Sequence, residues 1–445
     1  MRDRLMALDE AGDPIQVAII GCGRFGSMMI AQIARMPGMR VAVACDLDAE
    51  RATEALGRGE REVRPVIAQS VSKANDAIER DIPVVTESSQ VAIKAEVDVV
   101  VEATGIPDAG ARHAFDAIMA GTHVVMVNVE ADVLVGPILK KMADSAGVVY
   151  SLAYGDQPAL IEELYDWAAG LGFEVVAAGK GTMYLPEYRN GTPDEALARY
   201  GYSPEDAAVA GLNPRMYNSF LDGTKSAVEM CAVANMTGLM PDVPGMHFPP
   251  AGVRDLPRIL IPEEDGGILS RRGVVEVVSS LDRDGSEVAE STRWGVFAVI
   301  TSDSDYLRRC LKDYGLPTDP SGRYGAVYRP YHLVGMEAPV SIARAALYGE
   351  ATGSPRARVG EVVAVTKRRL DPGDVLDGEG GSTVYGILVD ATHATAERML
   401  PIGLCHGVRV VRPAVEGQTL GYGHVDLPPS GFARRLRELQ LESAA

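Results

Sequence analysis

The sequence predicts an α/β protein that begins with a doubly wound parallel sheet, and three observations support that prediction. Residues 16–150 alternate between continuous Val/Ile runs, such as 97–104, and amphipathic stretches, such as 110–121. Continuous apolar runs are typical of parallel strands that helices cover on both faces. A Gly-x-Gly-x-x-Gly turn joins the first strand to the first helix, and an acidic residue ends the next strand. Together these features predict a Rossmann dinucleotide-binding domain over residues 1–150.

The next stretch, 151–355, mixes helical and strand patterns and predicts an α+β substrate or catalytic domain. We expect helices at 157–172, 225–238, 304–315 and 339–349, and strands at 173–181, 273–281 and 294–302. The last two strands are expected to be antiparallel. Residues 241–267 are rich in Pro and Gly and predict an irregular segment.

Residues 356–445 have a different composition, after a plausible linker at 352–360. Short apolar runs alternate with turn residues, as in LDPGDVLD (370–377), and FARRLRELQLE (432–442) has a helical pattern. We therefore expect a small all-β module that ends in a helix.

Composition excludes several classes of function. The net charge of the 445 residues is −18, and such a field repels phosphate backbones and anionic lipids. Five scattered cysteines without a Cys-x-x-Cys pair argue against a disulfide scaffold and a structural zinc site. The sequence has no run of about 18 apolar residues and no signal-like start. We expect a cytoplasmic protein without nucleic-acid or membrane partners, and a homodimer by base rate.

The turn at 21–26 carries the dinucleotide prediction. Gly21 suits a tight turn, Gly23 allows the backbone to approach a pyrophosphate, and Gly26 allows close packing of helix on strand. Arg24 and Phe25 open the helix, whose N–H groups face the phosphates. Asp46, twenty residues after Gly26, is placed to accept hydrogen bonds from ribose hydroxyls. The alternative is a structural Gly-rich turn.

Two further strand ends are expected at this site. Ala103, Thr104 and Gly105 end a strand near the expected nicotinamide ribose, and Asn128 and Glu130 end another. Ordinary turn polarity is the alternative for both. The choice between NAD and NADP stays open, because Asp46 repels a 2′-phosphate whereas Arg24 and Arg51 attract one.

The densest polar cluster predicts the catalytic groups. Asn218, Ser219 and Asp222 precede a helix on which Lys225 and Glu229 are four residues apart, so Asp222, Lys225 and Glu229 can share a face. Such a set supplies a cation to polarise a carbonyl and a carboxylate to move a proton. A surface ion pair is the alternative. Lys180 ends a strand between two glycines, where it would meet a ligand phosphate or carbonyl, or simply solvent.

A basic-aromatic patch lies further along. Arg323, Arg329, Tyr331 and His332 fall within SGRYGAVYRPYH, and two arginines with tyrosine hydroxyls suit a phosphate or carboxylate. A core or interface cluster is the alternative. No spacing marks a metal site, although Asp156, Asp222 and Glu229 are candidate ligands for Mg²⁺ or Mn²⁺.

Several of these motifs resemble homoserine dehydrogenase: GCGRFG (21–26), GKGTMYLPEYRNGTPDEALARYGYSPEDA (179–207) and FLDGTKSAVEMCAVAN (220–235). LDPGDVLDGEGG and LPIGLCHGVRVVRPAVEGQTL resemble the SAF fold, a small β-clip. The combination is similar to homoserine-dehydrogenase-like proteins with a C-terminal SAF domain. One branch of them is the 1-deoxy-D-xylulose 5-phosphate reductoisomerase-like enzymes, which make methylerythritol phosphate, an isoprenoid precursor, with NADPH.

The sequence departs from homoserine dehydrogenase at the substrate site. The family has an aspartate and a lysine four apart on its catalytic helix, where Lys225 and Glu229 reverse the signs, and Glu130 stands where the family has a lysine. Glu205 keeps the character of the family's substrate-binding glutamate. The resemblance thus implies an NAD(P)-dependent oxidoreductase for a small anionic carbonyl or polyol substrate, with a reductoisomerase-like activity foremost. A homoserine or sugar-acid dehydrogenase and a non-catalytic dinucleotide or carbohydrate sensor are the alternatives.

Overall fold

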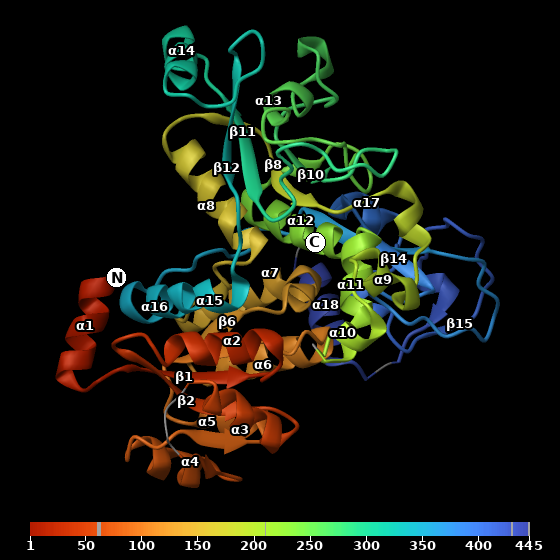
Figure 1. The fold of residues 1–445 in the computed structure, drawn as a ribbon. Coiled ribbons are helices and arrows are strands. Elements are labelled where there is room, and N and C mark those ends of the chain that lie inside the picture. Colours follow the sequence, from red (N-terminus) through yellow and green to blue (C-terminus); the bar gives the residue numbers. More distant parts are fainter. Residues whose placement is uncertain (60–63, 210, 429, 444–445) are drawn as a thin grey trace. The chain divides into compact units, whose positions relative to one another are not determined.

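The computed structural model describes residues 1–59, 64–209, 211–428 and 430–443. Contacts between residues divide the chain into two compact units, each built from separate stretches of sequence (Figure 1). Unit 1 comprises Met1–Leu160, Leu333–Pro355 and Ser430–Ala445, and unit 2 comprises Ile161–His332 and Arg356–Pro429. Three consecutive sequence segments therefore do not describe how the chain packs.

Unit 1 contains a sheet of seven parallel strands in the order β3-β4-β2-β1-β5-β6-β7. The strands are β1 (Ile15–Ile20), β2 (Met39–Cys45), β3 (Val66–Ile67), β4 (Val84–Thr86), β5 (Val99–Glu102), β6 (His123–Met126) and β7 (Tyr150–Leu152). The strand order reverses beside β1, so β1 and β5 flank the switch point at which such sheets bind ligands. The predicted doubly wound sheet is confirmed.

Helices surround this sheet: α1 (Arg2–Ala11), α2 (Arg24–Ile33), α3 (Ala49–Gly57), α4 (Val71–Ile78), α5 (Ser89–Lys94), α6 (Pro107–Met119), α7 (Val129–Ala146), α15 (Val334–Glu337), α16 (Pro339–Tyr348) and α18 (Phe432–Glu442). Ile342 and Ala343 of α16 lie in the same buried core as Val17 of β1 and Val101 of β5. The stretch 333–355 thus completes the core of unit 1.

Helix α18 packs on α6 and α7, and its Gln440 side chain binds the backbone of α7 beside Pro137. Pro137 lies inside α7, and a proline disturbs the ladder of backbone hydrogen bonds. The Gln440 side chain of α18 accepts a hydrogen bond from Ile138 N at 3.1 Å and donates one to Leu134 O at 3.3 Å. The predicted C-terminal helix is confirmed, and it belongs to unit 1 rather than to the β-rich stretch before it.

Unit 2 contains a mixed five-stranded sheet in the order β12-β11-β8-β10-β9. Its strands are β8 (Glu174–Thr182), β9 (Met240–Pro241), β10 (Val274–Ser279), β11 (Val296–Thr301) and β12 (Tyr324–Arg329). We expected β10 and β11 to be antiparallel strands, and the structure separates them by β8. Strand β10 runs parallel to β8 and β11 runs antiparallel to it. The continuous apolar runs predicted the strands but not that β8 lies between β10 and β11.

The helices of unit 2 are α8 (Gln157–Gly170, shared in sequence with unit 1), η1 (Pro186–Asn190), α9 (Pro193–Arg199), α10 (Pro204–Val209), α11 (Pro214–Leu221), α12 (Thr224–Thr237), α13 (Leu256–Ile259), η2 (Glu263–Asp265) and α14 (Asp305–Asp313). Helix α12 has hardly any exposed surface: twelve of its residues are buried. Gly223, with φ of 85°, lets the chain turn sharply from α11 into α12.

The stretch 356–429 also packs within unit 2. Strands β13 (Gly360–Thr366) and β14 (Val384–Asp390) form an antiparallel pair that lies on α12. The remaining elements are short: α17 (Ala391–Ala396), η3 (Ile402–Leu404), β15 (Arg409–Val410), η4 (Tyr422–His424) and β16 (Val425–Asp426). Gly386 N of β14 donates to the Thr224 hydroxyl of α12 at 2.8 Å. Across the described part of the chain, no helix combines the length and apolar character needed to cross a membrane.

Candidate active site

The Gly-rich turn of unit 1 has the geometry that a dinucleotide requires. Gly21 has φ of 99°, and a Cβ there would lie 2.7 Å from the Ala103 backbone. A Cβ on Gly26 would lie 2.0 Å from Gly21 O, so helix α2 approaches the turn only because residue 26 is glycine. A Cβ on Gly23 would meet nothing within 4 Å. The open side at Gly23 is where the motif brings its backbone to a pyrophosphate, so these residues fit NAD(P).

Asp46 follows β2 and binds the turn itself. Its Oδ2 accepts a hydrogen bond from Cys22 N at 2.8 Å, and its Oδ1 accepts one from Asp48 N at 3.1 Å. Arg51 Nη1 lies 3.8 Å from Oδ1, with its own side chain 58 % exposed. Arg24 is exposed and Phe25 half-buried at the start of α2. The carboxylate therefore shapes the turn as well as lying next to the expected ribose position.

The second expected cofactor contact, Ala103-Thr104-Gly105, rests on a buried carboxylate. Glu102, the last residue of β5, is fully buried and accepts hydrogen bonds from the Thr104 hydroxyl and, at 3.3 Å, from Thr104 N. Asn128 caps α7 and donates to Ile106 O at 3.1 Å. Asn128 is 1 % exposed, so it acts by holding this loop in place.

A second buried carboxylate lies in the first turn of α7, near the half-buried Glu130. Asp132 is fully buried, and its Oδ1 accepts a hydrogen bond from the Tyr150 hydroxyl at 2.9 Å. Its Oδ2 has no hydrogen-bond partner among the described residues. Burial raises the pKa of Asp132 to about 7. Neither buried carboxylate was predicted, because Asp132 and Glu102 look like ordinary polar residues at the ends of elements in the sequence.

In unit 2, Lys180 and Glu229 form a buried ion pair. Lys180 lies on β8, the central strand of the sheet, and Glu229 lies on α12. Their side chains are 7 % and 5 % exposed, and Lys180 Nζ donates to Glu229 Oε2. Both residues were candidates from sequence, but their pairing was not foreseen. A buried charge pair of this kind is a proton donor and acceptor held in one place.

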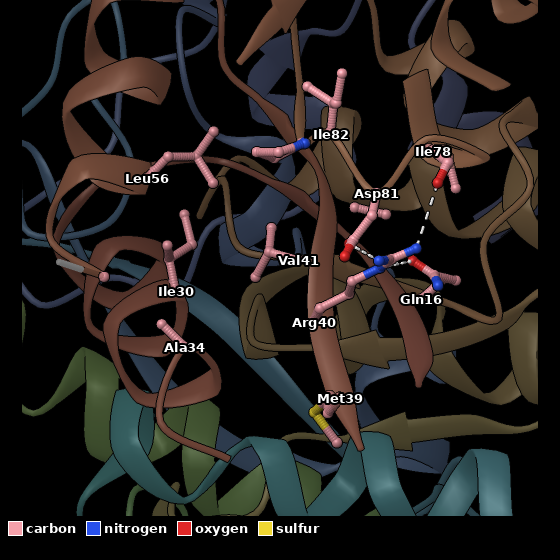
Figure 2. A pocket seen from close by; sticks show the side chains of 13 residues that line it. Gln16, Ile30, Ala34, Met39, Arg40, Val41, Leu56, Ile78, Asp81 and Ile82 are labelled. Carbon is pink, nitrogen blue, oxygen red and sulfur yellow. Dashed lines mark hydrogen bonds and ion pairs between the residues drawn. The ribbon is translucent and has the colours of Figure 1, made fainter. Parts of the chain in front are cut away.

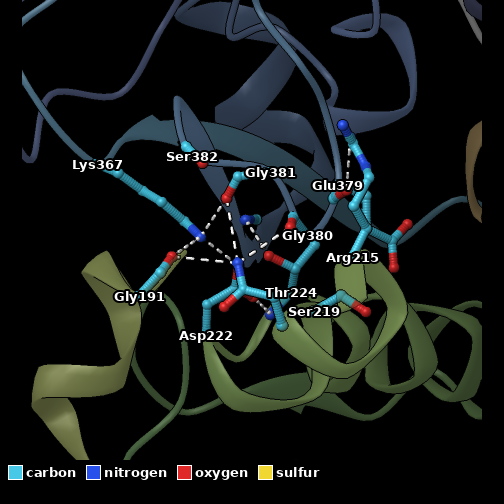
Figure 3. A network of polar contacts seen from close by, with 12 residues as sticks. Gly191, Arg215, Ser219, Asp222, Thr224, Lys367, Glu379, Gly380, Gly381 and Ser382 are labelled. Carbon is cyan, nitrogen blue, oxygen red and sulfur yellow. Dashed lines mark hydrogen bonds and ion pairs between the residues drawn. The ribbon is translucent and has the colours of Figure 1, made fainter. Parts of the chain in front are cut away.

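Asp222 binds a lysine that the sequence analysis missed. Lys367 Nζ lies 2.7 Å from Asp222 Oδ2, and the two side chains are 1 % and 0 % exposed. Lys367 also donates to Gly191 O at 2.8 Å and Gly381 O at 2.7 Å (Figure 3). Asp222 Oδ1 accepts from Thr224 N at 2.9 Å, at the start of α12. All these groups have partners, so the network fastens the 377–383 loop to α11 and α12.

Asn218 and Ser219 belong to the same structural region. The Asn218 amide donates to Gly191 O, Gly380 O and Gly381 O at 3.0 to 3.2 Å, and the Ser219 hydroxyl donates to Met216 O at 2.8 Å. We expected one face of one helix to combine Asp222, Lys225 and Glu229. That expectation is corrected: Asp222 ends α11, and other lysines bind both carboxylates. Lys225 is half-buried in the first turn of α12.

The predicted basic-aromatic patch is split in two. Arg329 ends β12, and the register Lys180↔Val296↔Arg329 puts Lys180 and Arg329 on the same face of the sheet. Arg323 precedes β12 and pairs with Asp265. Because each residue of a strand advances about 3.3 Å, the backbones of Arg323 and Arg329 are about 20 Å apart. Both arginines therefore cannot bind one small ligand, which corrects the expectation for Arg323.

The aromatic members of the patch lie beside Arg329. Its guanidinium is 4.8 Å from the centre of the Tyr331 ring, and Arg329 Nη1 is 3.7 Å from Glu163 Oε2. His332 Nδ1 lies 2.9 Å from Trp294 O. Glu205 is exposed on α10 and is not brought to these residues by any contact recorded in the described chain.

Another buried carboxylate was missed in unit 2. Glu276 of β10 is fully buried and accepts hydrogen bonds from His247 N, at 3.1 Å, and from His247 Nδ1, at 2.7 Å. The hydrogen bond to Glu276 raises the pKa of His247. Met246 and Phe248, on either side of His247, have φ of 64° and 51°. Side chains of this size rarely adopt that conformation, so the buried carboxylate holds a strained segment.

A pocket in unit 1 lies away from the Gly-rich turn. It has a volume of about 140 Å³ and is lined by apolar side chains such as Ile30, Leu56 and Ile82 (Figure 2). Arg40 crosses its floor, where Nε donates to Gln16 Oε1 at 2.8 Å and the guanidinium pairs with Asp81. Gln16 and Arg40 belong to the first residues of β1 and β2, so this pocket opens at the amino ends of the strands.

The described residues do not fit a divalent cation. No three His, Cys, Asp or Glu side chains among them lie close enough to hold one metal ion. Two of the candidate ligands, Asp222 and Glu229, are bound by lysines. A metal would have to displace these ammonium groups, so no step is derived through one.

Two family models match the sequence. Residues 21–150 match the NAD-binding domain of homoserine dehydrogenase, and residues 155–338 match the catalytic domain of oxidoreductase DRL. No curated protein matches the chain. The two matches cover the Gly-rich turn in one case and the Lys180–Glu229 pair in the other.

Solved structures give more distant likenesses. The chain is similar to a probable dehydrogenase from Thermotoga maritima, at 12 % identity over 77 % of this chain and 91 % of that one, with a TM-score of 0.34. It is similar to a DOX-P reductoisomerase solved with fosmidomycin and magnesium, at 18 % identity over 49 % and 57 %, with a TM-score of 0.33. It is also similar to apo scyllo-inositol dehydrogenase from Lactobacillus casei, at 14 % identity over 42 % of this chain and 48 % of that one, with a TM-score of 0.27. The last two matches span about half of those proteins, and TM-scores this low carry no argument. The domain matches and the Gly-rich turn together identify the chain as an oxidoreductase with an NAD-binding domain.

Proposed function

We propose that this protein reduces the carbonyl group of a small anionic substrate with NADH or NADPH, and that its activity is of the 1-deoxy-D-xylulose 5-phosphate reductoisomerase type. The buried Lys180–Glu229 pair is the observation that supports this proposal most. Burying an ammonium group costs free energy, so a lysine on the central strand of a sheet with only 7 % of its side chain exposed is unusual. This cost favours a functional role for Lys180. The resemblance of residues 370–381 and 400–420 to the SAF fold is part of the same proposal.

In the proposed chemistry, Lys180 donates a proton to the substrate and Glu229 accepts one from it. A dinucleotide held by the turn of Gly21, Gly23 and Gly26 would supply the hydride for the carbonyl carbon. Lys180 Nζ donates a hydrogen bond to the carbonyl oxygen and transfers a proton to it as the alkoxide forms. Glu229 holds the Lys180 ammonium group in position before the reaction. In the preceding rearrangement Glu229 takes the proton of one substrate hydroxyl, whose carbon becomes the new carbonyl, and returns it to the oxygen of the original carbonyl. The two side chains are largely shielded from solvent, which strengthens the electrostatic interactions of both with the substrate.

Arg329 is the proposed anchor for the anionic end of the substrate. It shares a face of the sheet with Lys180 and lies two strands away, about 10 Å at the usual strand spacing. That separation suits a substrate whose carbonyl and phosphate lie at opposite ends. A guanidinium binds phosphate through two parallel hydrogen bonds, and Tyr331 adds a neighbouring aromatic ring. Lys225 remains a proposed catalytic group, and Glu130 remains a proposed substrate contact.

The choice of dinucleotide depends on residues beside the turn. Both oxygens of Asp46 accept hydrogen bonds from the backbone, and Arg51 lies beside one of them, so the charge near the ribose is compensated. We expect Arg51→Ala to weaken NADPH binding more than NADH binding, since only NADPH has a 2′-phosphate. Equal effects on the two would show that Arg51 does not contact that group.

Turnover of a carbonyl panel tests the proposal. Oxidation of NADH and NADPH is followed with deoxyxylulose 5-phosphate, aspartate semialdehyde and keto-sugar acids, with and without Mg²⁺. We expect Lys180→Met and Glu229→Gln to lower kcat at least about a hundredfold, the usual share of a positioned acid or base. Lys312→Met, which removes an exposed lysine of α14, is the matched control.

The outcomes separate the possible functions. Turnover of deoxyxylulose 5-phosphate supports the reductoisomerase-type reaction. Turnover of only aspartate semialdehyde or a sugar acid keeps the oxidoreductase and replaces the substrate. A Lys180→Met variant that reacts as fast as the wild type removes Lys180 from the mechanism. Tight NAD(P)H binding without any turnover favours a sensor.

A further inference from the structure

Unit 2 contains a second pocket, distinct from the Lys180–Glu229 pair. Its volume is about 490 Å³, within the usual range for small-molecule sites. Met183 follows β8, and Ser280 and Leu281 follow β10, so the pocket opens at the carboxyl ends of these parallel strands. Ligands of α/β sheets bind at such an edge.

The pocket lies on the opposite face of the sheet from Lys180. Tyr328 lines it and is the neighbour of Arg329 in β12, and successive side chains of a strand point to opposite faces. Arg329 shares the face of Lys180 through the strand register. The pocket is therefore not the reacting end of the proposed substrate site.

One polar side chain that lines this pocket makes no hydrogen bond to the described residues. Ser280 is 4 % exposed and lines the pocket, and no hydrogen bond of its hydroxyl is recorded among the described residues. The hydroxyl can therefore donate a hydrogen bond to a ligand in the pocket and accept one from it. Glu290, at the rim, has φ of 49°, an uncommon conformation for a residue that is not glycine. Backbone strain of this kind clusters at ligand sites.

The charges around the pocket favour an uncharged ligand. Glu290 is bound by Arg254 at 2.9 Å, which leaves Glu287 and Arg293 as one negative and one positive lining group. Glu287 repels an anion. Arg293 repels a cation and already lies 5.0 Å from the centre of the Trp294 ring, the position that an organic cation would take.

The same groups require a ligand that both donates and accepts hydrogen bonds. A carboxylate only accepts and a guanidinium only donates, whereas a hydroxyl group does both. Trp294 is 59 % exposed, and the part of its indole ring that Arg293 leaves uncovered can pack against the C–H groups of a sugar ring. We propose that this pocket binds an uncharged polyhydroxy compound of monosaccharide size, as a second site of the protein.

Tryptophan fluorescence tests the proposal directly. The sequence has two tryptophans, so Trp167→Phe leaves Trp294 as the single indole reporter. This variant is titrated with xylitol and D-glucose, with glucose 6-phosphate as the anionic probe and choline as the cationic probe. We expect a saturable change with the two uncharged compounds. Adding Ser280→Ala should weaken it about threefold to tenfold, the worth of one hydrogen bond.

Ser286→Ala, at an exposed serine of the same loop outside the pocket lining, is the matched control and should leave the binding unchanged. Unchanged NADH binding by every variant shows that the protein is folded, and it separates this test from that of the reaction. No saturable change with xylitol or D-glucose overturns the proposal. So does stronger binding of glucose 6-phosphate or choline, or an equal effect of Ser280→Ala and Ser286→Ala.

Discussion

Replacing Asp132 with asparagine should make unit 1 less sensitive to pH. The carboxyl is fully buried, and burial raises its pKa from 3.8 to about 7. The folded state therefore binds this proton more tightly than the unfolded state does. The resulting stability is present at low pH and is lost as the pH rises from the unfolded value through about 7.

The size of the effect follows from the shift. Each pKa unit corresponds to about 1.4 kcal/mol, so the whole shift is worth roughly 4 kcal/mol. Between about pH 5 and pH 8 the wild-type protein should lose roughly 3 kcal/mol of local stability from this group. Asparagine has nearly the same shape but does not titrate, so Asp132→Asn should remove that slope and be the more stable protein at the upper pH.

Hydrogen exchange read by mass spectrometry gives the opening free energy of peptides from α7 and β7, after correction for the intrinsic effect of pH. Asp144→Asn is the matched control, because Asp144 lies on the same helix with its side chain 61 % exposed. A wild-type protein whose opening free energy does not change with pH in these peptides would contradict this prediction, and so would an Asp132→Asn variant that keeps the wild-type pH dependence.

Three further predictions concern other parts of the molecule. Gly26→Ala should disrupt the turn and abolish NADH binding, whereas Gly23→Ala should fold normally and only weaken binding, as unfolding and NADH titrations would show. Lys367→Met should cost about 3–5 kcal/mol in denaturant unfolding by leaving a buried carboxylate unpaired, and adding Asp222→Asn should restore much of it. For His247, whose pKa is raised, the stabilising hydrogen bond is present below about pH 6.5 and lost as the pH rises through the folded pKa. The melting temperature of the wild type should therefore approach that of His247→Asn as the pH rises; a constant difference would contradict this.

The sequence predicted those features that depend on neighbouring residues. Four strands of unit 1, β1, β2, β5 and β6, follow from continuous apolar runs, whereas the short strands β3, β4 and β7 were not predicted. The dinucleotide turn follows from glycine spacing with Asp46 at the next strand end. Helix α12 begins after Gly223, as its pattern indicates. Each of these signals lies within a few tens of residues, where periodicity and turn chemistry act.

Pairings between distant side chains were beyond such signals. Lys180 and Glu229 are 49 residues apart, and Asp222 and Lys367 are 145 apart. Helical spacing therefore suggested the local partner Lys225, whereas tertiary packing supplied two other lysines. Arg323 and Arg329 look adjacent in the sequence, yet the extended backbone of β12 separates them. Residues that are close in the sequence lie far apart along an extended strand, whereas packing of the core brings residues that are distant in the sequence into contact.

The hydrogen bonds between the Gln440 side chain of α18 and the backbone of α7 set an order of events during synthesis. Gln440 binds Ile138, a residue made 302 positions earlier. At about 5–20 residues per second, α7 waits on the order of tens of seconds on the ribosome before the side chain that completes its interrupted ladder exists. Until then the sheet of unit 1 can form, but one of its covering helices has unsatisfied backbone groups beside Pro137. We therefore expect the nascent first domain to stay loosely packed, and accessible to chaperones and proteases, until translation of α18 is complete.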